Sequence, residues 1–501
     1  MRERLALLAG ALVAFGASLG SGFHFDDYAI FADPALRSGW GWLEIWRLRQ
    51  TRPLTYLTFW LNYQVGGRDP LGYHALNLAL HLGLVLLIFE CLRRLVPARA
   101  AWIAAAIFAV HPIQAEAVDY IWGRSIVLAG LFCAAALWAW LDGRRWLAVV
   151  WFALALLAKE ECAAFPVVLA LWEWRRASAR QTGKLKHAPP GGACFSLPMN
   201  STGPIAVMIV LALAAAARVV YATAVTPGAP AGLQAGISPW KYFLAQGVVI
   251  PRYLRLLVVP YGFTVDPEIH VPSVWLGVAA WLAILAAAVW LWKQAPRWPG
   301  APWLVAGIVL LLPSSSIFPA ADLAADRRMY LPLVAFATAA ALWLAKAKLP
   351  ALGAIVACAL ALVSVTRTYV WMSDATLWRE AVRRAPDKTR PKIQLSRAVP
   401  AAEALELLTQ AAIQAPYDPA VAAETGRVFL EERLPDAALR EFGRALALDP
   451  RNAQNYNNRG VALDELGQVA AAREDFERAL ALDPGLAEAR ENLEKLTAAA
   501  P

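Results

Sequence analysis

Two adjacent carboxylates follow the first apolar run of the chain, in the segment Phe25-Asp26-Asp27-Tyr28. If both were charged they would repel each other, so without a cationic partner one of the two pKa values is expected to be raised. A carboxylate in that state can act as a general base that takes the proton of an attacking hydroxyl group. The pair could equally be a solvated helix cap, and its spacing alone does not decide between these two interpretations.

A second group of polar residues lies at or near the ends of apolar runs. Taken singly, each cation is typical of a membrane anchor whose charged head reaches the surface. If several cations lined one cavity they would hold a phosphate group, through charge-assisted hydrogen bonds to its oxygens. The carboxylates among them could orient the cations or a sugar. The candidate phosphate- and sugar-binding residues are Arg52, His74, His111, Glu116, Arg124, Lys159, Glu160, Arg327 and Arg328.

His74, Asn77 and His81 recur at spacings of three and four residues, so they share one face of a helix. Such a face is typical of hydrogen bonds between packed helices. Metal ligation has less support, because no carboxylate completes the set at helical spacing. The five cysteines are scattered and form no CxxC pair, so neither a zinc site nor a disulfide framework is indicated. We expect no metal site and no obligatory cofactor.

The composition indicates which elements must position these residues. Hydrophobic residues make up 59% of the 501 residues and charged residues only 17%, whereas a soluble chain is usually nearer half apolar and a quarter charged. Most of the chain is therefore expected to lie in a membrane, and a purely cytosolic or a disordered protein is excluded. Because the basic excess lies in loops between apolar runs, the net charge of +9 does not predict a nucleic-acid partner.

Eleven apolar runs are candidate membrane spans, since about 20 apolar residues cross a bilayer. The first could instead be a cleaved signal peptide. Residues 240–259 are apolar but contain three cations and a proline, which favours an interfacial or re-entrant helix. The spans are expected near 5–21, 72–92, 100–118, 125–141, 145–159, 162–174, 204–224, 273–292, 302–319, 329–346 and 349–370.

Basic residues cluster in alternate loops, which the positive-inside rule assigns to the cytoplasm. With eleven spans, the N-terminus is then cytoplasmic and the C-terminal tail extracytoplasmic, on the same side as the carboxylate-rich loops. Residues 22–71 form the first external loop, and 175–203 form a cytoplasmic linker. The basic clusters are Arg2/Arg4, Arg93/Arg94/Arg99, Arg144/Arg145, Arg175/Arg176/Arg180/Lys184/Lys186, Lys293/Arg297 and Lys346/Lys348.

The tail repeats with a period of 34 residues. Small residues let paired helices approach, an aromatic residue fills the groove between pairs, and proline ends the second helix of each pair. This pattern predicts tetratricopeptide units at 419–452 and 453–486, a degenerate unit near 387–418 and a capping helix. A solenoid of this kind usually presents a peptide-binding or oligomerisation surface. The matching positions are Pro416/Pro450/Pro484, Phe442/Phe476, Ala438/Ala472, Ala445/Ala479 and Gly426/Gly460.

Together these motifs resemble the transmembrane and tetratricopeptide-repeat-containing (TMTC) O-mannosyltransferases, within the GT-C class of glycosyltransferases. The resemblance covers the whole chain in order. The motifs that carry it are FDDY at 25–28, RPLTYLTFWLNY at 52–63, GYHALNLALH at 72–81, HPIQAEAVDYIWGR at 111–124, AKEE at 158–161, DRRMYLP at 326–332 and the repeats of the tail.

The resemblance implies an all-α fold, with a GT-C-like membrane domain at 1–372 and a repeat solenoid at 373–501. It further implies transfer of a mannose-like sugar from a polyprenyl-phosphate donor to a Ser or Thr hydroxyl of a protein acceptor, which the repeats could hold. Asp26 or Asp27 would be the general base of an inverting reaction, and the cations would offset charge on the leaving phosphate. The composition suggests a bacterial inner-membrane protein.

Three other functions are compatible with the sequence. A GT-C enzyme could glycosylate a lipid or a polysaccharide by nearly the same chemistry. A non-enzymatic membrane scaffold could present the repeats for assembly. A transporter or flippase is disfavoured, because it would need charges at the middle of the membrane, whereas here the polar residues are expected to gather at one face.

Overall fold

The computed structural model of the chain describes residues 1–47, 50–181, 201–226 and 231–498. These residues form α-helices and 3-10 helices, and an isolated β-bridge joins Ala231 to Ala320. The prediction of an all-α fold is confirmed. The chain divides into two compact units, Met1–Ser373 and Asp374–Pro501.

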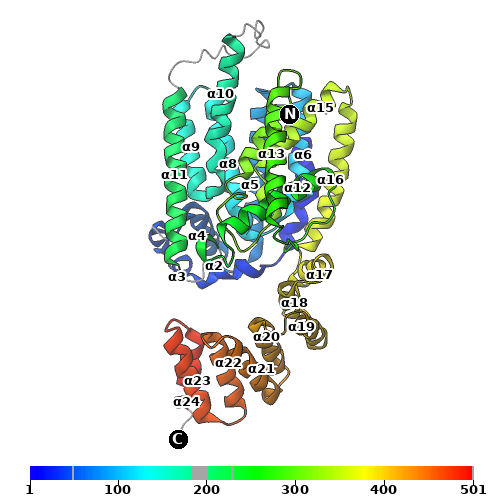
Figure 1. Ribbon diagram of the computed structural model, residues 1–501. Helices are drawn as coiled ribbons and strands as arrows, with labels where there is room; N and C mark the ends of the chain where they lie inside the picture. Colours follow the sequence, from blue (N-terminus) through cyan, green and yellow to red (C-terminus); the bar gives the residue numbers. More distant parts are fainter. Residues whose placement is uncertain (48–49, 182–200, 227–230, 499–501) are drawn as a thin grey trace. The chain divides into compact units, whose positions relative to one another are not determined.

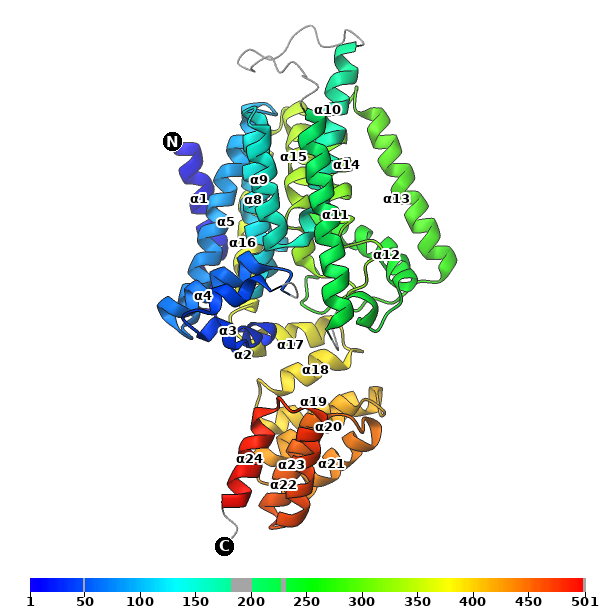
Figure 2. The same cartoon turned by 90° about the vertical axis from the view of Figure 1, so that its left-hand side faces the viewer.

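The first unit is a bundle of long apolar helices (Figures 1 and 2). Several begin at a proline in the first helical position, where the missing backbone N–H would have no partner in any case. Pro70, Pro332 and Pro350 are examples. The long helices are α1 (Arg2–Phe15), α5 (Pro70–Arg93), α6 (Ala98–Val110), α8 (Arg124–Leu141), α9 (Arg145–Ala158), α10 (Phe165–Gln181), α11 (Thr202–Val225), α12 (Pro239–Val258), α13 (Val274–Gln294), α14 (Ala301–Leu311), α15 (Pro332–Lys346) and α16 (Pro350–Val370).

Among the described residues, six segments are long and apolar enough to cross a membrane, and a seventh is possible if a bent pair counts as one span. The bend of 49° separates α6 from Pro112–Val118, because a proline disfavours helical geometry in the residue before it. Three predicted spans are shorter apolar helices, namely α9, α14 and α15. The chain therefore has the helices of a polytopic membrane protein, while the number eleven stays a prediction.

The linker predicted at 175–203 begins later than expected, because α10 continues to Gln181 and α11 begins at Thr202. Residues 182–200, with the predicted basic residues Lys184 and Lys186, lie outside the described residues. The interfacial or re-entrant segment predicted at 240–259 is the helix α12, which contains Pro251.

Loops that the sequence assigns to the cytoplasm meet at one end of the bundle. Arg4 lies 2.8 Å from Glu90 at the end of α5. The next two contacts join Arg94 to Asp142 at 3.8 Å and Arg145 to Glu173 at 3.4 Å. The Arg175 guanidinium donates to the carbonyl of Ala295 over 2.9 Å. The predicted grouping of these loops thus agrees with their contacts.

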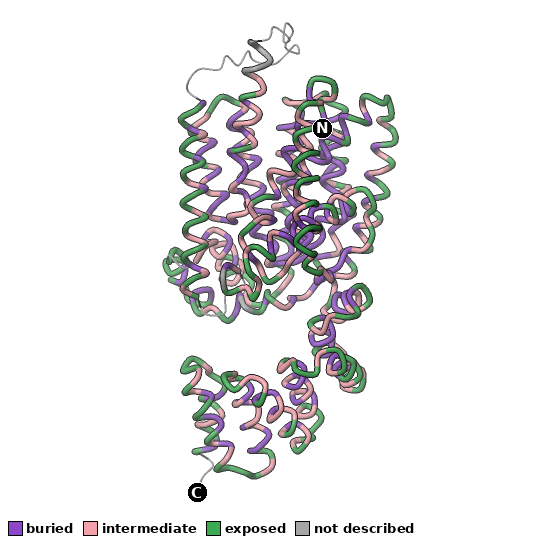
Figure 3. The backbone as a smooth tube through the Cα atoms, in the orientation of Figure 1, coloured by how far each residue is buried: buried purple, intermediate pink, exposed green. Residues whose placement is uncertain are grey.

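Short helices cover the other end of the bundle, where α2, α3 and α4 lie (Figures 1 and 2). They connect the ends of the long helices and carry most of the predicted site residues. The buried residues are concentrated in the helices at the centre of the bundle (Figure 3). In α13, by contrast, Gly277 is the one buried residue. The short elements are η1 (Gly16–Gly20), η2 (Phe25–Asp27), α2 (Tyr28–Ala32), α3 (Pro34–Arg37), η3 (Gly41–Trp46), α4 (Pro53–Gly66), η4 (Pro112–Gln114), α7 (Ala115–Val118), η5 (Ile121–Gly123), η6 (Glu160–Ala164), η8 (Gly232–Gln234) and η9 (Asp326–Met329).

The second unit consists of helices that pair as the 34-residue period predicts. In each of the two clear repeats, a glycine of the first helix packs against a phenylalanine of the second. A Cβ atom added at Gly426 would lie 2.9 Å from Phe442, and one at Gly460 would lie 2.7 Å from Phe476, so neither position has room for a side chain. The helices are α17 (Asp374–Arg384), α18 (Thr389–Ser396), α19 (Ala401–Gln414), α20 (Pro419–Glu431), α21 (Pro435–Leu448), α22 (Ala453–Glu465), α23 (Val469–Leu482) and α24 (Ala487–Ala498).

Candidate functional site

The two predicted aspartates have opposite environments. The Asp27 side chain is fully buried, and its two oxygens accept hydrogen bonds from the backbone N–H groups of His24 at 3.0 Å and Trp122 at 2.9 Å. Burial raises the pKa of Asp27 to about 7, although these hydrogen bonds act in the opposite direction. Asp26 is exposed. Asp27 therefore joins two loops, whereas Asp26 is the carboxylate that a substrate can reach.

Replacing Asp27 by asparagine should loosen this junction. The amide keeps one oxygen as acceptor but turns an N–H₂ group toward the second backbone N–H, which then stays buried without a partner. An unsatisfied buried group costs about 1–3 kcal/mol, so we expect a lower thermal midpoint for Asp27→Asn. An unchanged midpoint would show that the two hydrogen bonds do not stabilise the loop.

The stability difference between these two proteins should also depend on pH. Because burial raises the pKa of Asp27 from 3.8 to about 7, the folded protein keeps a proton that the unfolded chain has lost. The contribution of Asp27 to stability therefore falls as the pH rises from 3.8 to about 7. Asparagine does not titrate, so the advantage of the wild type should be largest near the lower limit. A constant difference over this range would contradict a raised pKa.

Tyr120 is close to both the acidic loop and the cations. Its ring stacks on Phe25 with a centroid separation of 4.8 Å. Burial, followed by the charges of Asp27 and Asp26, raises the pKa of the Tyr120 phenol well above its ordinary value, while the charge of Arg327 lowers it. The charges of Asp26 and Arg327 thus both influence the pKa of Tyr120, whose buried hydroxyl has no hydrogen-bond partner among the described residues.

Arg52 and Glu160 form a two-pronged ion pair. Arg52 directly precedes Pro53, which starts α4, and Glu160 follows the break after α9. The guanidinium nitrogens lie 2.7 and 3.2 Å from the carboxylate oxygens. Burial alone would raise the pKa of Glu160, but the charge and hydrogen bonds of Arg52 lower it to about 2. Glu160 therefore stays ionised and fixes the guanidinium plane of Arg52.

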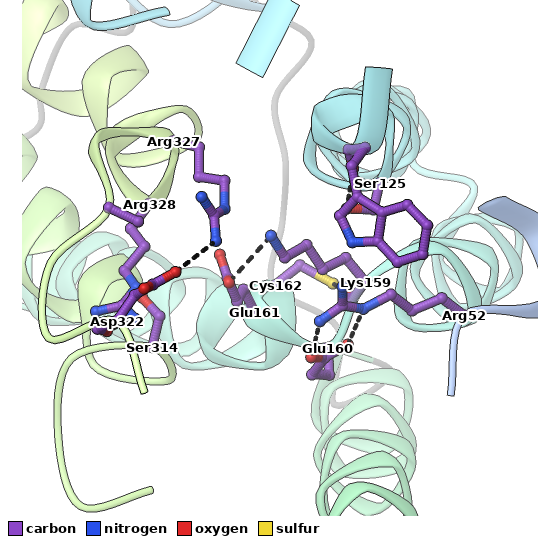
Figure 4. A network of polar contacts seen from close by, with 12 residues as sticks. Arg52, Ser125, Lys159, Glu160, Glu161, Cys162, Ser314, Asp322, Arg327 and Arg328 are labelled. Atoms are coloured by element: carbon purple, nitrogen blue, oxygen red, sulfur yellow. Dashed lines mark hydrogen bonds and ion pairs between the residues drawn. The ribbon is translucent and has the colours of Figure 1, made fainter. Parts of the chain in front are cut away.

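Lys159 lies between α9 and η6 in an extended conformation, so the helical axis is interrupted at this residue. Its ammonium group is 3.1 Å from Glu161, and its side chain is 4% exposed. Burial lowers the pKa of Lys159 to about 8, although the charge of Glu161 acts in the opposite direction. Figure 4 shows this pair between the Arg52–Glu160 pair and Arg327.

Arg327 and Arg328 lie in η9, just before α15, and bind different partners. Arg327 forms an ion pair with Glu116, whose second oxygen accepts from the Arg327 backbone N–H at 3.0 Å. Arg328 donates to the backbone carbonyls of Leu323 at 3.0 Å and Asp322 at 2.7 Å. Among the residues that the structure describes, Arg328 makes no ion pair with a carboxylate, so its charge is the least neutralised of the cations in Figure 4.

Six predicted residues thus lie in one layer, which also includes Glu161 and Asp322. Two of these contacts join elements far apart in the chain, Arg52 to Glu160 and Arg327 to Glu116. We call this group the charged layer. Its predicted members are Arg52, Glu116, Lys159, Glu160, Arg327 and Arg328.

Three other predicted residues direct polar groups to neighbouring helices and loops, and the buried Nδ1 of His74 has no hydrogen-bond partner among the described residues. His74 contacts the carbonyl of Gly22 at 3.1 Å, and His111 accepts from the N–H of Ile113 while its other nitrogen is 3.3 Å from Leu257 O. Arg124 is fully buried and donates to Asn77, Asn62, Thr58 and the carbonyl of Tyr73. These contacts give all three residues structural roles between helices, so a contact with a phosphate or sugar remains a prediction without support from their geometry.

Tyr120, Glu161 and Asp322 are not among the site residues predicted from the sequence. Glu161 follows Glu160 in the AKEE motif, and Tyr120 lies within HPIQAEAVDYIWGR, so both had a signal in their neighbours. Asp322 had only its place in an acidic loop. Among the described residues no group of three or more His, Cys, Asp and Glu side chains is placed to hold a metal ion.

An apolar groove reaches the charged layer from outside the bundle. It has a volume of about 510 Å³ and its walls come from α10, α11 and α14. Ile209, Leu213 and Val309 are typical of the lining, and Glu160 is the charged residue among those that line the groove. Because α11 is a candidate membrane span with little of its surface buried, the groove is placed where an apolar chain could enter from the lipid.

Comparison with known proteins supports both parts of the sequence interpretation. The chain is 38% identical over 160 residues to protein O-mannosyl-transferase Tmtc1 of Drosophila melanogaster, which is 28% of this chain and 18% of that protein. It is 40% identical over 144 residues to TMTC1 of Homo sapiens, covering 25% of this chain and 16% of that protein. With Tmtc2 of Drosophila melanogaster the identity is 33% over 206 residues, or 35% and 22% of the two chains.

The matched part thus spans about a fifth of the length of these relatives. Residues 453–486 match the tetratricopeptide repeat family. A solved tetratricopeptide protein of Thermus thermophilus, TTC0263, is 18% identical and covers 28% of this chain and 81% of its own, with a TM-score of 0.24. The predicted resemblance is confirmed: the chain is similar to the TMTC protein O-mannosyl-transferases and carries a tetratricopeptide repeat.

Proposed function

We propose that this protein is a membrane glycosyltransferase that moves a mannose-like sugar from a polyprenyl phosphate to a Ser or Thr hydroxyl of a protein acceptor. The observation that carries the proposal is the position of Asp26. It is exposed, its neighbour Asp27 is held by two backbone N–H groups, and its other neighbour Phe25 stacks on Tyr120, whose pKa the charge of Arg327 also influences. The similarity to protein O-mannosyl-transferases supports the reaction class.

In the proposed reaction, Asp26 takes the proton of the acceptor hydroxyl as the oxygen attacks C1 of the sugar. The new C1–oxygen bond forms while the bond from C1 to the phosphate oxygen breaks, and its electron pair leaves with the lipid phosphate. Attack opposite the leaving group inverts the anomeric centre. Arg328 offsets the charge that develops on the phosphate. No nucleotide takes part in this transfer.

Three ion pairs of the charged layer have a defined part in this proposal. Glu160 holds Arg52, Glu161 faces Lys159, and Glu116 holds Arg327. Cations held in this way need little rearrangement when charge develops on a phosphate. His74, His111 and Arg124 act instead by supporting the helices that carry the layer.

The proposed donor lipid lies in the apolar groove, with its phosphate toward Glu160 and the neighbouring cations. A polyprenyl chain is apolar, so transfer from water into such a groove is favourable. This arrangement presents the sugar on the side of the membrane opposite the basic loops, which we place in the cytoplasm. We infer a bacterial inner membrane, with the repeats extracytoplasmic and available to a protein acceptor.

Blocking the groove should weaken binding of long-chain donors. Ala216 lines the groove, and phenylalanine at this position would occupy part of it. We expect Ala216→Phe to raise the KM for a long polyprenyl-phosphate sugar about tenfold, which corresponds to roughly 1.4 kcal/mol of lost contact. A donor with a single isoprene unit should be used equally well by both proteins.

A matched control is available on the same helix. Ala214 is exposed and does not line the groove, so Ala214→Phe should leave both KM values unchanged. Equal effects of the two substitutions, or an equal loss for long and short donors, would contradict the placement of the lipid chain.

The proposal as a whole is tested by incubating purified protein with a radiolabelled mannosyl polyprenyl phosphate and a Ser/Thr-rich acceptor peptide. Label in the peptide that alkali-catalysed elimination releases would support an O-linked product. If the label appears only in lipid or polysaccharide, the acceptor is one of those classes and the proposed protein acceptor is wrong.

A further inference from the structure

The residues on either side of Asp26 are held at three separate points. The backbone N–H of His24 and that of Trp122 donate to Asp27. Phe25 stacks on Tyr120 at a centroid separation of 4.8 Å and an interplanar angle of 26°. Asp26 itself is the exposed member of this short 3-10 helix. The surroundings thus fix the backbone of the loop while leaving the Asp26 carboxylate accessible.

The third point is Trp371, the residue that ends α16 and lies 345 positions after Asp26 in the chain. Its backbone carbonyl is 2.6 Å from Nε2 of His24 and accepts a hydrogen bond from the Ser21 hydroxyl at 2.5 Å. A carbonyl oxygen can only accept, so Nε2 of His24 must carry a proton. Both lone pairs of this carbonyl are therefore used by the segment that leads into the acidic loop.

The indole of Trp371 contacts the same loop through its rings. It is fully buried, lies edge-to-face against His24 at 5.8 Å, and stacks on Tyr120 at 5.5 Å with an angle of 26°. Tyr120 in turn stacks on Phe25, so Trp371, Tyr120 and Phe25 form a continuous column. Stacked aromatic pairs contribute about 0.5–1.5 kcal/mol each beyond their buried area, which makes this column a rigid support.

The last turn of α16 is itself anchored to the bundle. Thr368 has its hydroxyl 3.1 Å from the carbonyl of Ala14 and 2.9 Å from Asp119. One turn earlier, Ser364 donates to the carbonyl of Val110 at 2.5 Å. These contacts reach α1, the end of α6 and the segment that carries Tyr120. Trp371 is therefore a fixed point and not a loose chain end.

We infer that His24 and Trp371 are positioning residues, which form a clasp that holds the Asp26 carboxylate at the distance and angle required for proton transfer. The inference rests on the proposed function, in which Asp26 is the base. Neither residue is placed to touch the substrate, and both act through the backbone of residues 24–27. Loss of the clasp should displace the carboxylate, and a displacement of about 1 Å can cost roughly 100-fold in rate.

Two pairs of variants separate positioning from folding. His24→Leu removes the Nε2 donor, whereas the side-chain amide of His24→Gln can donate from nearly the same place. Trp371→Ala removes the column, whereas Trp371→Phe keeps a ring in it. We expect His24→Leu and Trp371→Ala to lower kcat at least tenfold with the KM for the donor unchanged, and the conservative variants to recover most of the rate.

A measurement independent of activity tests the clasp itself. Amide hydrogen exchange in residues 22–33 should increase in His24→Leu and Trp371→Ala and stay near the wild-type rate in His24→Gln. Trp343→Ala, which changes an exposed tryptophan of α15, is the control and should alter neither readout. Unchanged kcat and unchanged exchange in His24→Leu would overturn the inference.

The two proposals can fail separately. If Asp26→Asn transfers sugar at the wild-type rate, the proposed base is wrong even when exchange in the loop responds to His24→Leu. If Asp26→Asn is inactive but neither kcat nor exchange changes in His24→Leu and Trp371→Ala, Asp26 remains the proposed base. The positioning role of His24 and Trp371 is then wrong. Should Trp371→Ala fail to fold, His24→Leu and His24→Gln alone decide the outcome.

Discussion

Asp26→Asn is expected to lower sugar transfer by about 10²- to 10⁴-fold, the range that a general base contributes. The amide is nearly the same size as the carboxylate but cannot take the proton of the acceptor hydroxyl. Because Asp26 is exposed, the substitution should leave the thermal midpoint within a degree or two of the wild type. Initial rates at saturating donor and acceptor measure the effect.

The neighbouring aspartate is the matched control for this prediction. Asp27→Asn should reduce stability first and activity only as a consequence, because Asp27 is buried and binds two backbone N–H groups. The two roles would be reversed if Asp26→Asn caused a large loss of stability. They would also be reversed if Asp27→Asn were stable but inactive while Asp26→Asn stayed active.

Arg328→Gln should give the second large effect, a loss of about 10²- to 10³-fold in kcat/KM for the donor, as for removal of a donor to a developing anion. Arg328 is buried, lines a small pocket with Glu161 and Ser314, and has no carboxylate ion pair among the described residues. Its charge is therefore available to a phosphate. Arg328→Lys keeps the charge and should recover part of the activity.

Inhibition by the product separates phosphate binding from folding. Free polyprenyl phosphate should inhibit Arg328→Gln much more weakly than wild type, whereas the uncharged polyprenol should bind both proteins alike. Arg327→Gln offers a contrast, because it removes the partner of the buried Glu116 carboxylate, and an uncompensated buried charge should lower stability as well as activity. Equal inhibition of Arg328→Gln and wild type by the phosphate would contradict the assignment.

The fold and the site could be predicted from the sequence only where they depend on local spacing or on composition. The repeats were predicted with their boundaries, because Gly426 with Phe442 and Gly460 with Phe476 pack within one 34-residue unit. Local spacing fixes such contacts. The membrane character followed from composition, but helix lengths did not, since α14 ends at Leu311 while the apolar run continues toward 319.

Long-range pairing was the part that the sequence could not supply. Arg52 and Glu160 are 108 residues apart and Arg327 and Glu116 are 211 apart, so nothing in their spacing indicates a pair. For the same reason Arg124 was grouped with the phosphate-binding cations, although the structure directs it to Asn77 and Asn62. Trp371 had no signal at all, because its role depends on a backbone carbonyl and on a stacked column.

The adjacent aspartates illustrate the same limit within one motif. Their spacing suggested mutual repulsion and a raised pKa for one of them. The structure finds the raised pKa at Asp27, but its main cause is burial and the charge of Asp26 is the smallest contribution. Which aspartate is buried depends on how η2 packs against η5. This is a tertiary contact, so it cannot be predicted from two adjacent residues.

The most direct measurement is transfer of radiolabelled mannose from polyprenyl phosphate to an acceptor peptide by purified wild-type and Asp26→Asn proteins of equal thermal stability. The proposed function predicts an O-linked, stereochemically inverted product with the wild type and a rate at least about 100-fold lower with Asp26→Asn. Equal transfer by the two proteins, or no transfer by a folded wild type supplied with donor and acceptor, would contradict it.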